Sequence, residues 1–351
     1  MKIAVYTIAK NEEQHVVRWF SSCKDADYVL IADTGSTDNT VALAKELGIK
    51  VVPIHISPWR FDDARNAALA ALPADIDVCV ALDMDEELQP GWREHLESLD
   101  SDVNRPRYKY VWSWNADGSE GLTYGGDKIH GRNGFRWKHP VHETIVAVNG
   151  ETQKWCGLEI HHHPDDSKSR AQYFGLLEVA KLESPDCDRT AFYYARELFF
   201  HGRIDEAAVE FKRHLDLPRA VWRPERAASM RYLGKCGVDS EYWFWRACAE
   251  SLGSRESWVD LAMFYYQQRN WGAVRKAASS ALEITEKPLE YLCEADAWGW
   301  KPHDLLAVAC WNLGDVDSAV EHGALAVGLC PRDERLVRNL DFYSSSNESS
   351  L

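Results

Sequence analysis

Two aspartates separated by a single residue, Asp83 and Asp85, directly follow a short apolar run at residues 78–82. A continuous apolar run of this length is typical of a strand that is buried on both faces, as in a parallel sheet. Because ligands bind to open α/β sheets beyond the carboxyl ends of the strands, we expect both carboxylates in a binding site. At this spacing they can converge on one hard cation, which can in turn hold a diphosphate. The next two residues, Glu86 and Glu87, are expected to be solvated or to lead a helix.

A run of three histidines, His161, His162 and His163, is the second group of residues that could do chemistry. It follows a strand expected at residues 155–160, so His161 and His163 should point to one side of the strand and His162 to the other. Neutral imidazole is a good ligand for Mn²⁺. The run is therefore interpreted either as the source of a metal ligand or as a solvated turn.

The elements that must position these residues alternate along the first half of the chain. Apolar, β-rich runs predict strands, and helical patterns lie between them, with the strands at residues 3–8, 28–32, 51–52 and 78–82. Repetition of strand, helix and strand at this spacing implies right-handed crossovers and a parallel sheet. Three polar segments, residues 9–12, 33–38 and 83–86, then meet at the carboxyl edge of that sheet.

The pattern changes further along the chain. From about residue 107 it alternates and is rich in aromatic residues, which predicts antiparallel strands up to residue 160. We expect a first domain at residues 1–165, a helical domain at 166–345 and a frayed tail at 346–351.

The helical part shows weak internal repetition, at residues 194–208, 261–274 and 306–320. The first two copies are spaced by about twice the ~34-residue tetratricopeptide period, and the third is off this period. Each copy cannot bury its apolar face alone and must stack on its neighbours.

The bulk composition of the 351 residues restricts the function classes. A formal net charge of −15 argues against broad nucleic-acid binding, although a local basic groove stays open. The residues that could form it are Lys128, Arg132, Arg136, Lys138 and Arg170. Nine cysteines without paired or zinc-like spacing indicate reduced thiols, as in a cytosolic protein. We find no signal peptide and no apolar run long enough to span a membrane, so we expect a cytoplasmic protein.

Four motifs, in order, carry a resemblance to a known family. They are Thr7-Ile8-Ala9-Lys10-Asn11-Glu12, Asp33-Thr34-Gly35-Ser36-Thr37-Asp38, Ala64-Arg65-Asn66 and Asp83-Met84-Asp85. With them, residues 3–90 resemble a family 2 glycosyltransferase of GT-A fold, in which the last motif binds the metal. Residues 131–143 and the helical tail resemble the bacterial branch that fuses this domain to tetratricopeptide-like repeats. The implied fold class is α/β, with a mostly parallel sheet domain followed by an all-α helical repeat domain.

The resemblance implies binding roles for individual residues. Ala9 and Glu12 would contact the nucleotide, and Asp33 would read the base unless it only forms a turn. Arg65 would neutralise diphosphate charge, since arginine is permanently charged and binds phosphate through two donors.

The metal ligands also follow from the resemblance, because the family often completes its site with a late histidine. Asp85 would ligate a divalent cation, Mn²⁺ or Mg²⁺, directly, and Asp83 would reach the ribose or the cation through water. Among the histidines we choose His163, with His161 second. The bound cation would stabilise the departing nucleoside diphosphate as a Lewis acid.

A base is needed near the acceptor if the sugar is transferred with inversion. Glu143 could take this role, with His142 orienting the acceptor or a phosphate. The alternative is a buried His–Glu pair that only holds the loop. Trp137 and His139 either line an acceptor groove or belong to the core.

These residues together predict a metal-dependent inverting glycosyltransferase that uses a nucleotide-sugar, with a UDP-sugar as the first candidate. The acceptor stays open between a protein, a glycan, a small molecule and a modified DNA base. The helical domain would bind the acceptor or form a homodimer. One alternative is a nucleotidyltransferase, which is disfavoured because residues 9–12 contain no Gly-rich phosphate loop. The other is a non-catalytic nucleotide-binding scaffold, which the intact acidic motif disfavours.

Overall fold

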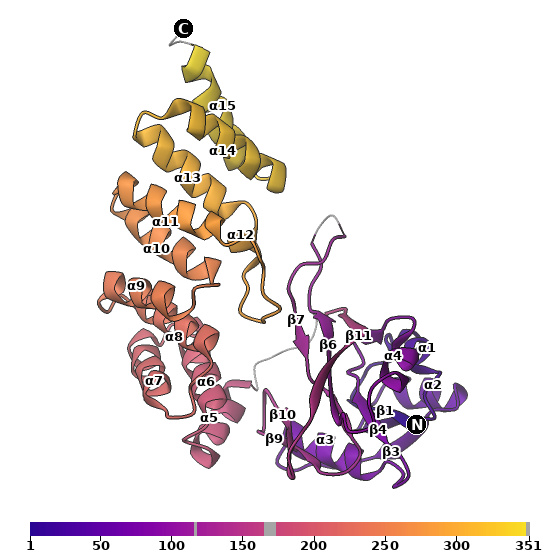
Figure 1. Ribbon diagram of the computed structural model, residues 1–351. Helices are drawn as coiled ribbons and strands as arrows, with labels where there is room; N and C mark the ends of the chain where they lie inside the picture. Colours follow the sequence, from indigo (N-terminus) through magenta and orange to yellow (C-terminus); the bar gives the residue numbers. More distant parts are fainter. Residues whose placement is uncertain (116–117, 165–172, 349–351) are drawn as a thin grey trace. The chain divides into compact units, whose positions relative to one another are not determined.

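The computed structural model describes residues 1–115, 118–164 and 173–348 (Figure 1). The chain divides into two compact units, Met1–Glu183 and Ser184–Leu351. The domain boundary expected between residues 165 and 166, and Arg170 of the expected basic groove, lie outside the described residues.

A five-stranded sheet forms the centre of the first unit, in the order β3-β2-β1-β4-β8. Its strands are β1 (Ile3–Ala9), β2 (Tyr28–Asp33), β3 (Lys50–Pro53), β4 (Val78–Ala81) and β8 (Ile129–Gly131). The first four are parallel to one another, whereas β8 runs antiparallel to β4. The mostly parallel sheet predicted from the sequence is confirmed.

Both faces of this sheet are covered, which explains why its strands are apolar without alternation. On one face Ile3 and Val5 pack in a core with Trp19. On the other face Ala4 and Tyr6 pack in a second core. The helices of the unit are α1 (Val16–Cys23), α2 (Thr40–Glu46), α3 (Phe61–Ala70), α4 (Trp92–Glu97) and α5 (Tyr173–Glu183).

A second sheet of the first unit has the order β5-β11-β6-β7. Its strands are β5 (Glu86–Leu88), β6 (Arg105–Val111), β7 (Thr123–Gly126) and β11 (Gln153–His162), and β9 (Phe135–Lys138) pairs with β10 (Thr144–Ala147). Strand β5 starts directly after the acidic motif and runs antiparallel to β11, with His162 opposite Glu86. This pairing brings the histidine run beside the carboxylates.

The second unit is built of helical hairpins, as predicted. Their helices are α6 (Asp188–Phe200) with α7 (Ile204–Asp216), α8 (Arg223–Lys235) with α9 (Ser240–Glu250), α10 (Arg255–Gln267) with α11 (Trp271–Glu283), and α13 (Lys301–Asn312) with α14 (Val316–Leu329). Gly202 and Gly314 follow the first helix of two hairpins in the left-handed conformation, with φ of 73° and 80°. This conformation ends a helix and lets the chain reverse.

An insertion at residues 284–300, which contains α12 (Ala295–Trp298), separates α11 from α13 and explains why the third sequence copy is off period. It runs back past α10 to α8 (Figure 1). The Tyr291 hydroxyl donates to Glu225 of α8 at 2.6 Å, and its ring stacks 6.1 Å from that of Tyr193 of α6. The insertion therefore covers the first helices of successive hairpins.

The C-terminal helix α15 (Glu334–Glu348) continues further than expected. The tail predicted to fray from residue 346 is helical as far as Glu348, and residues 349–351 lie outside the described part.

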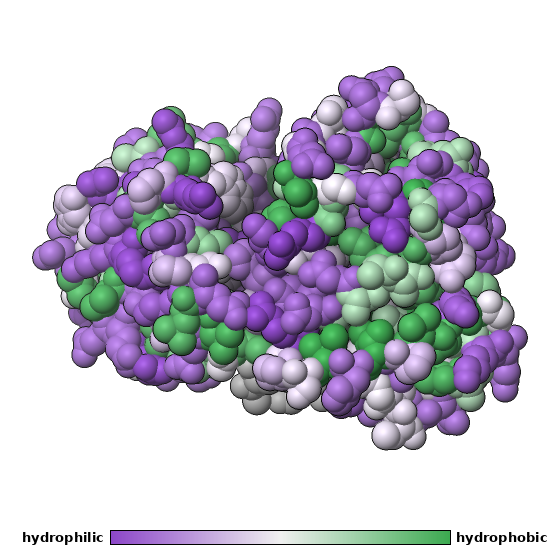
Figure 2. Space-filling model, turned by 90° about the horizontal axis from the view of Figure 1, so that it is seen from below, coloured by the Kyte–Doolittle hydropathy of each residue, from purple (hydrophilic) through white to green (hydrophobic). Residues whose placement is uncertain are grey.

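Hydrophilic residues cover most of the face shown in Figure 2, and hydrophobic residues form smaller groups between them. None of the helices in the described ranges is both long and apolar enough to cross a membrane.

Candidate active site

A cavity of about 920 Å³ opens in the first unit, lined by segments that follow the carboxyl ends of β1, β2 and β4. Its lining includes many residues predicted from the sequence: Ala9, Glu12, Arg65, Asp83, Asp85, His142 and Glu143. His162 and Lys128 also line it. Convergence of these side chains is expected where parallel strands end at one edge of a sheet.

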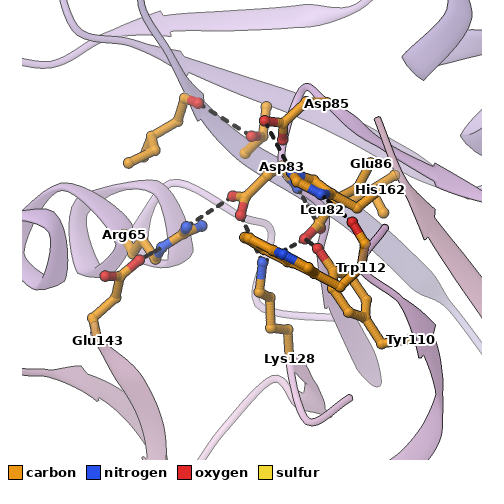
Figure 3. A network of polar contacts seen from close by, with 12 residues as sticks. Arg65, Leu82, Asp83, Asp85, Glu86, Tyr110, Trp112, Lys128, Glu143 and His162 are labelled. Atoms are coloured by element: carbon orange, nitrogen blue, oxygen red, sulfur yellow. Dashed lines mark hydrogen bonds and ion pairs between the residues drawn. The ribbon is translucent and has the colours of Figure 1, made fainter. Parts of the chain in front are cut away.

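Arg65 of α3 connects the acidic motif to the expected base (Figure 3). Its Nη2 lies 2.8 Å from Asp83 Oδ1, and its Nε donates to Glu143 Oε1 at 2.5 Å. The guanidinium also stacks over the ring of Trp137, 4.9 Å from the ring centre. Arg65 is therefore held in one orientation, with a carboxylate on either side.

Lys128, between β7 and β8, binds the same aspartate from another direction. Its Nζ lies 2.6 Å from Asp83 Oδ2 and 2.7 Å from Glu86 Oε1 (Figure 3). Glu86 also accepts hydrogen bonds from the backbone N–H of Asp83 and the hydroxyl of Tyr110, at 2.8 and 2.6 Å. The expectation that Glu86 is solvated or leads a helix is wrong, because it is 1% exposed and begins strand β5.

The charges in this network determine which groups are ionised. Burial alone would raise the pKa of Asp83, but the adjacent charges of Arg65 and Lys128 hold it well below its usual range. Burial would lower the pKa of Lys128, but Asp83 and Glu86 raise it well above its ordinary value. Burial raises the pKa of Glu86 even though Lys128 opposes the shift. Asp83 and Lys128 are therefore a stable anion and cation.

His162, at the end of β11, is the histidine that faces the acidic motif. Its Nε2 lies 3.5 Å from Asp85 Oδ2. Its Nδ1–H donates to the carbonyl oxygen of Trp112 at 2.9 Å, and the two rings stack 4.2 Å apart. Because Nδ1 is engaged by the carbonyl, Nε2 is the ring nitrogen that faces Asp85, where it can donate when protonated or ligate a cation when neutral.

The imidazoles of the two histidines chosen from the sequence, His161 and His163, are not brought to the carboxylate of Asp85. His161 Nε2 lies 3.4 Å from Glu159, and His163 Nε2 lies 3.2 Å from Glu87. The alternation predicted for the run is present. The residues chosen from the sequence lie on the other face of the strand, because pairing of β11 with β5 turns His162 toward the cavity.

The nucleotide-binding segments predicted after β1 and β2 are tied to each other. The carbonyl of Ala9 accepts hydrogen bonds from the N–H and hydroxyl of Thr34, at 2.9 and 3.1 Å. Asp33 uses its carboxylate to accept from the N–H groups of Gly35 and Ser36, at 3.1 and 3.2 Å. Asp33 thus forms a turn, and the neighbouring Thr34 lines the cavity in its place.

Aromatic residues that the sequence did not single out form another part of the cavity lining: Trp59, Phe61 and Tyr173. No sequence pattern points to them, because aromatic residues at the start of a helix or in a loop have no spacing that distinguishes a ligand site from the core. Trp137 belongs to the core, where its Nε1 donates to the Tyr6 hydroxyl at 2.8 Å, rather than to an acceptor groove.

Metal binding can be tested against the donor atoms present. Within the described ranges, no group of three or more His, Cys, Asp and Glu side chains is arranged so that it could hold a cation. Asp85 and His162 supply two donors, whereas both oxygens of Asp83 are bound by Arg65 and Lys128. Magnesium-type sites often combine one or two carboxylates with substrate phosphates, so this pair fits a cation that arrives with a diphosphate.

Comparison with known proteins finds a matching family model and several similar proteins. Residues 4–119 match the model of glycosyl transferase family 2. A protein of Rickettsia conorii described as an uncharacterized glycosyltransferase is 36% identical over 108 residues, covering 30% of this chain and 37% of that protein. A TPR repeat-containing protein of Synechococcus elongatus is 38% identical over 165 residues, covering 44% of this chain and 39% of that protein. The matches therefore span well under half the length of these relatives.

Among solved structures, glucosyl-3-phosphoglycerate synthase from Mycobacterium tuberculosis, in complex with Mn²⁺, UDP-glucose and phosphoglyceric acid, is 26% identical with a TM-score of 0.27. That similarity covers 31% of this chain and 44% of that chain.

Proposed function

We propose that this chain, in which residues 4–119 form a glycosyl transferase family 2 domain, is a cation-dependent inverting glycosyltransferase. Its donor would be a nucleotide-sugar, with a UDP-sugar as the first candidate. The observation that carries the proposal is the approach of His162 to Asp85 beside the Arg65–Asp83–Lys128 network, within one cavity. Asp85 and His162 offer two donor atoms to a metal cation, and Arg65 and Lys128 are two positively charged side chains in fixed positions. Together they suit a diphosphate, which is negatively charged.

The cation, Mn²⁺ or Mg²⁺, would be held by Asp85 and His162, and when bound it would supply Lewis-acid stabilisation to the leaving diphosphate. Arg65 would donate to the same diphosphate. Its Nη1 is buried and has no hydrogen-bond partner in the described part of the chain, so it can donate without breaking the bonds to Asp83 and Glu143. Asp83, which already binds the positively charged side chains of Arg65 and Lys128, would hold both of them in position.

Glu143 would serve as the base. Arg65 holds Oε1 of its carboxylate, and the residue lines the cavity. It would remove the proton of an acceptor hydroxyl while the acceptor oxygen bonds to the anomeric carbon. The bond from that carbon to the diphosphate oxygen breaks in the same displacement, which inverts the configuration.

The nucleotide would lie against the segment after β1, where Ala9 and Glu12 line the cavity together with Thr34. Asp33 would act there through the turn that places Thr34. The expectation that the helical unit contacts the acceptor or a second copy of the chain stays a prediction.

Calorimetric titration with UDP and GDP, with and without Mn²⁺, tests this function. We expect cation-dependent binding of a nucleoside diphosphate by the wild-type chain, and loss of the cation-dependent part in Asp85→Asn. Asp102→Asn is the matched control, because Asp102 is exposed and does not line the cavity. Failure of the wild-type chain to bind either nucleotide, or binding that Asp85→Asn leaves intact, would contradict the proposal.

A further inference from the structure

Four aromatic residues form a continuous set of ring contacts along the cavity lining, and we call them the aromatic wall: Trp59, Phe61, His142 and Tyr173. The rings of Trp59 and Phe61 lie 5.3 Å apart, and those of Phe61 and Tyr173 lie 5.8 Å apart. The His142 ring meets Tyr173 edge to face at 5.9 Å. Such T-shaped contacts hold each ring in a defined orientation.

Three separate segments are fastened together to build this wall. The backbone N–H of Phe61 donates to the carbonyl of Pro140 at 3.0 Å, which joins the start of α3 to the loop before His142. Arg60 binds both Asp62 and Glu183, the last residue of α5, at 2.9 and 2.7 Å. His142 has a left-handed backbone with φ of 49°, a conformation that packed surroundings must maintain.

The wall meets the charged network at Glu143. This residue follows His142 in the chain, and its carboxylate is bound by Arg65, which in turn binds Asp83. One cavity therefore has a charged part that suits a diphosphate and an aromatic part with different chemistry. The proposed base stands at their junction.

The aromatic wall itself carries no lysine or arginine. The nearby guanidinium of Arg60 is already bound by two carboxylates, Asp62 and Glu183. The Nε1–H of Trp59 is buried without a hydrogen-bond partner among the described residues. An indole N–H can only donate, so a ligand that reaches it must supply a hydrogen-bond acceptor such as a hydroxyl oxygen.

We propose that the aromatic wall is the acceptor subsite, and that the acceptor is an uncharged saccharide. Its ring would lie against the wall, and the hydroxyl that receives the sugar would point to Glu143. This inference rests on the proposed function, and it names the acceptor class that the sequence left open.

The chemistry of the wall favours a saccharide over a nucleic acid. A polyanion such as DNA is bound largely through lysine and arginine contacts to phosphates, which this surface does not offer. The cavity of about 920 Å³ must also hold a nucleotide-sugar, so the space left suits one or two rings. In a cavity whose lining is otherwise largely polar and charged, the wall offers aromatic faces and one indole N–H beside the carboxylate of Glu143.

Saturation-transfer NMR with the full chain, UDP and Mn²⁺ tests the subsite. The probes are the methyl glycosides of glucose, galactose and mannose, lactose, a serine- and threonine-containing peptide and a single-stranded oligonucleotide. We expect signal from at least one saccharide and none from the peptide or the oligonucleotide. Trp59→Ala should weaken saccharide binding about tenfold, the scale of one lost aromatic contact together with a hydrogen bond.

Variants separate loss of the subsite from loss of the fold. Trp59→Phe keeps a ring but removes the N–H, and it should weaken saccharide binding less than Trp59→Ala does. Trp155→Ala removes a tryptophan that is 52% exposed and outside the cavity, and it should change nothing. Every variant should bind UDP with wild-type affinity, which also shows that the domain is folded.

The outcomes are distinguishable. If the wild-type chain does not bind UDP, the proposed function fails. If UDP binds but no saccharide does, or if only the peptide or the oligonucleotide does, the saccharide subsite is overturned while the donor site stands. If Trp59→Ala weakens UDP binding instead of saccharide binding, the wall holds the nucleotide base and the inference is wrong.

Discussion

His162 Nε2 lies 3.5 Å from Asp85 Oδ2, although the histidine ends β11 and the aspartate follows β4. The contact exists because β5, which begins one residue after Asp85, pairs antiparallel with β11. The backbone N–H of His163 also donates to the carbonyl of Asp85, at 2.8 Å. A strand pairing between two sheet segments thus determines which histidine faces the cavity.

His162→Ala should weaken Mn²⁺-dependent UDP binding by at least about tenfold, because it would remove one of two protein donors to the cation. Cation-independent binding should change little. Calorimetric titration of UDP at fixed Mn²⁺ measures both quantities. His163→Ala is the control, because that imidazole pairs with Glu87 and is absent from the cavity lining. A larger effect of His163→Ala than of His162→Ala would reverse the assignment.

Lys128→Met should lower the free energy of unfolding by about 3 kcal/mol, since it leaves the buried carboxylate of Glu86 without its cation. Urea unfolding at neutral pH measures the change. Adding Glu86→Gln to Lys128→Met should recover part of the loss, because no buried charge is then left unpaired.

Lys109→Met provides the matched control for that experiment. Lys109 also bridges two carboxylates, Glu120 and Glu159, but these are more exposed, so the cost should stay below about 1 kcal/mol. Equal losses for Lys109→Met and Lys128→Met would show that burial of Glu86 does not matter.

Glu143→Gln should reduce sugar transfer at least about 100-fold while UDP affinity stays within about threefold, because the amide cannot accept the acceptor proton. Initial rates of transfer and calorimetric UDP titration check the two parts. Glu151→Gln is a suitable control, since Glu151 also binds an arginine, Arg105, but outside the cavity. Undiminished turnover of Glu143→Gln would remove Glu143 as the base.

His130 should make stability depend on pH. Its Nδ1–H donates to the carbonyl of Gly131 at 2.8 Å, and its Nε2 accepts from the Tyr6 hydroxyl at 2.9 Å, so the folded chain needs the neutral ring. Burial lowers the pKa of His130 from 6.5 to about 4. Between these values the unfolded chain binds a proton that the folded chain does not.

The sign of the effect follows from that proton. The contribution of His130 to stability is complete above pH 6.5 and falls as the pH approaches 4, by about 1.4 kcal/mol per pH unit. Urea unfolding at pH 7.5, 6 and 5 measures the slope, and NMR titration of the His130 ring measures the pKa. His130→Phe should be less stable at pH 7.5 but have a flatter slope, and parallel slopes would contradict the assignment.

Glu256→Ala should detach the insertion at residues 284–300 from α10. Glu256 Oε1 accepts from the backbone N–H of Glu294 at 3.0 Å and from Trp298 Nε1 at 2.7 Å, and both donors would lose their partner. We expect a loss of about 2 kcal/mol and faster hydrogen exchange in the insertion. Glu286→Ala, at an exposed position of the same insertion, should leave exchange unchanged. Equal exchange in the two variants would show that Glu256 does not anchor it.

Much of the architecture could be predicted from the sequence because it is written in local patterns. The apolar run at residues 78–82 predicted a strand buried on both faces, and Val78–Ala81 is β4 at the centre of a parallel sheet. The repeated helical segments predicted stacked hairpins. The insertion that disturbs their period could not be foreseen, because it is held by contacts to α8 and α10 rather than by a pattern of its own.

The site was predictable only in part, because some of its contacts depend on tertiary packing and not on a local pattern. The pattern of strands placed Asp83 and Asp85 at the carboxyl edge of the sheet, whereas Arg65 was assigned to the site only by the resemblance to the family. The sequence identifies Lys128 only as a basic residue near the site. Its bonds to Asp83 and Glu86 depend on how the segment between β7 and β8 lies against the acidic motif.

The sequence by itself therefore determined the acidic motif at a strand end, its neighbours at the same edge of the sheet, and the alternation of the histidine run. Only the tertiary structure decided that His162 faces Asp85, that Asp83 is bound by two cations, and that an aromatic wall adjoins Glu143. The physical reason is that periodicity defines two faces of a strand, whereas strand pairing and register define which face meets the site.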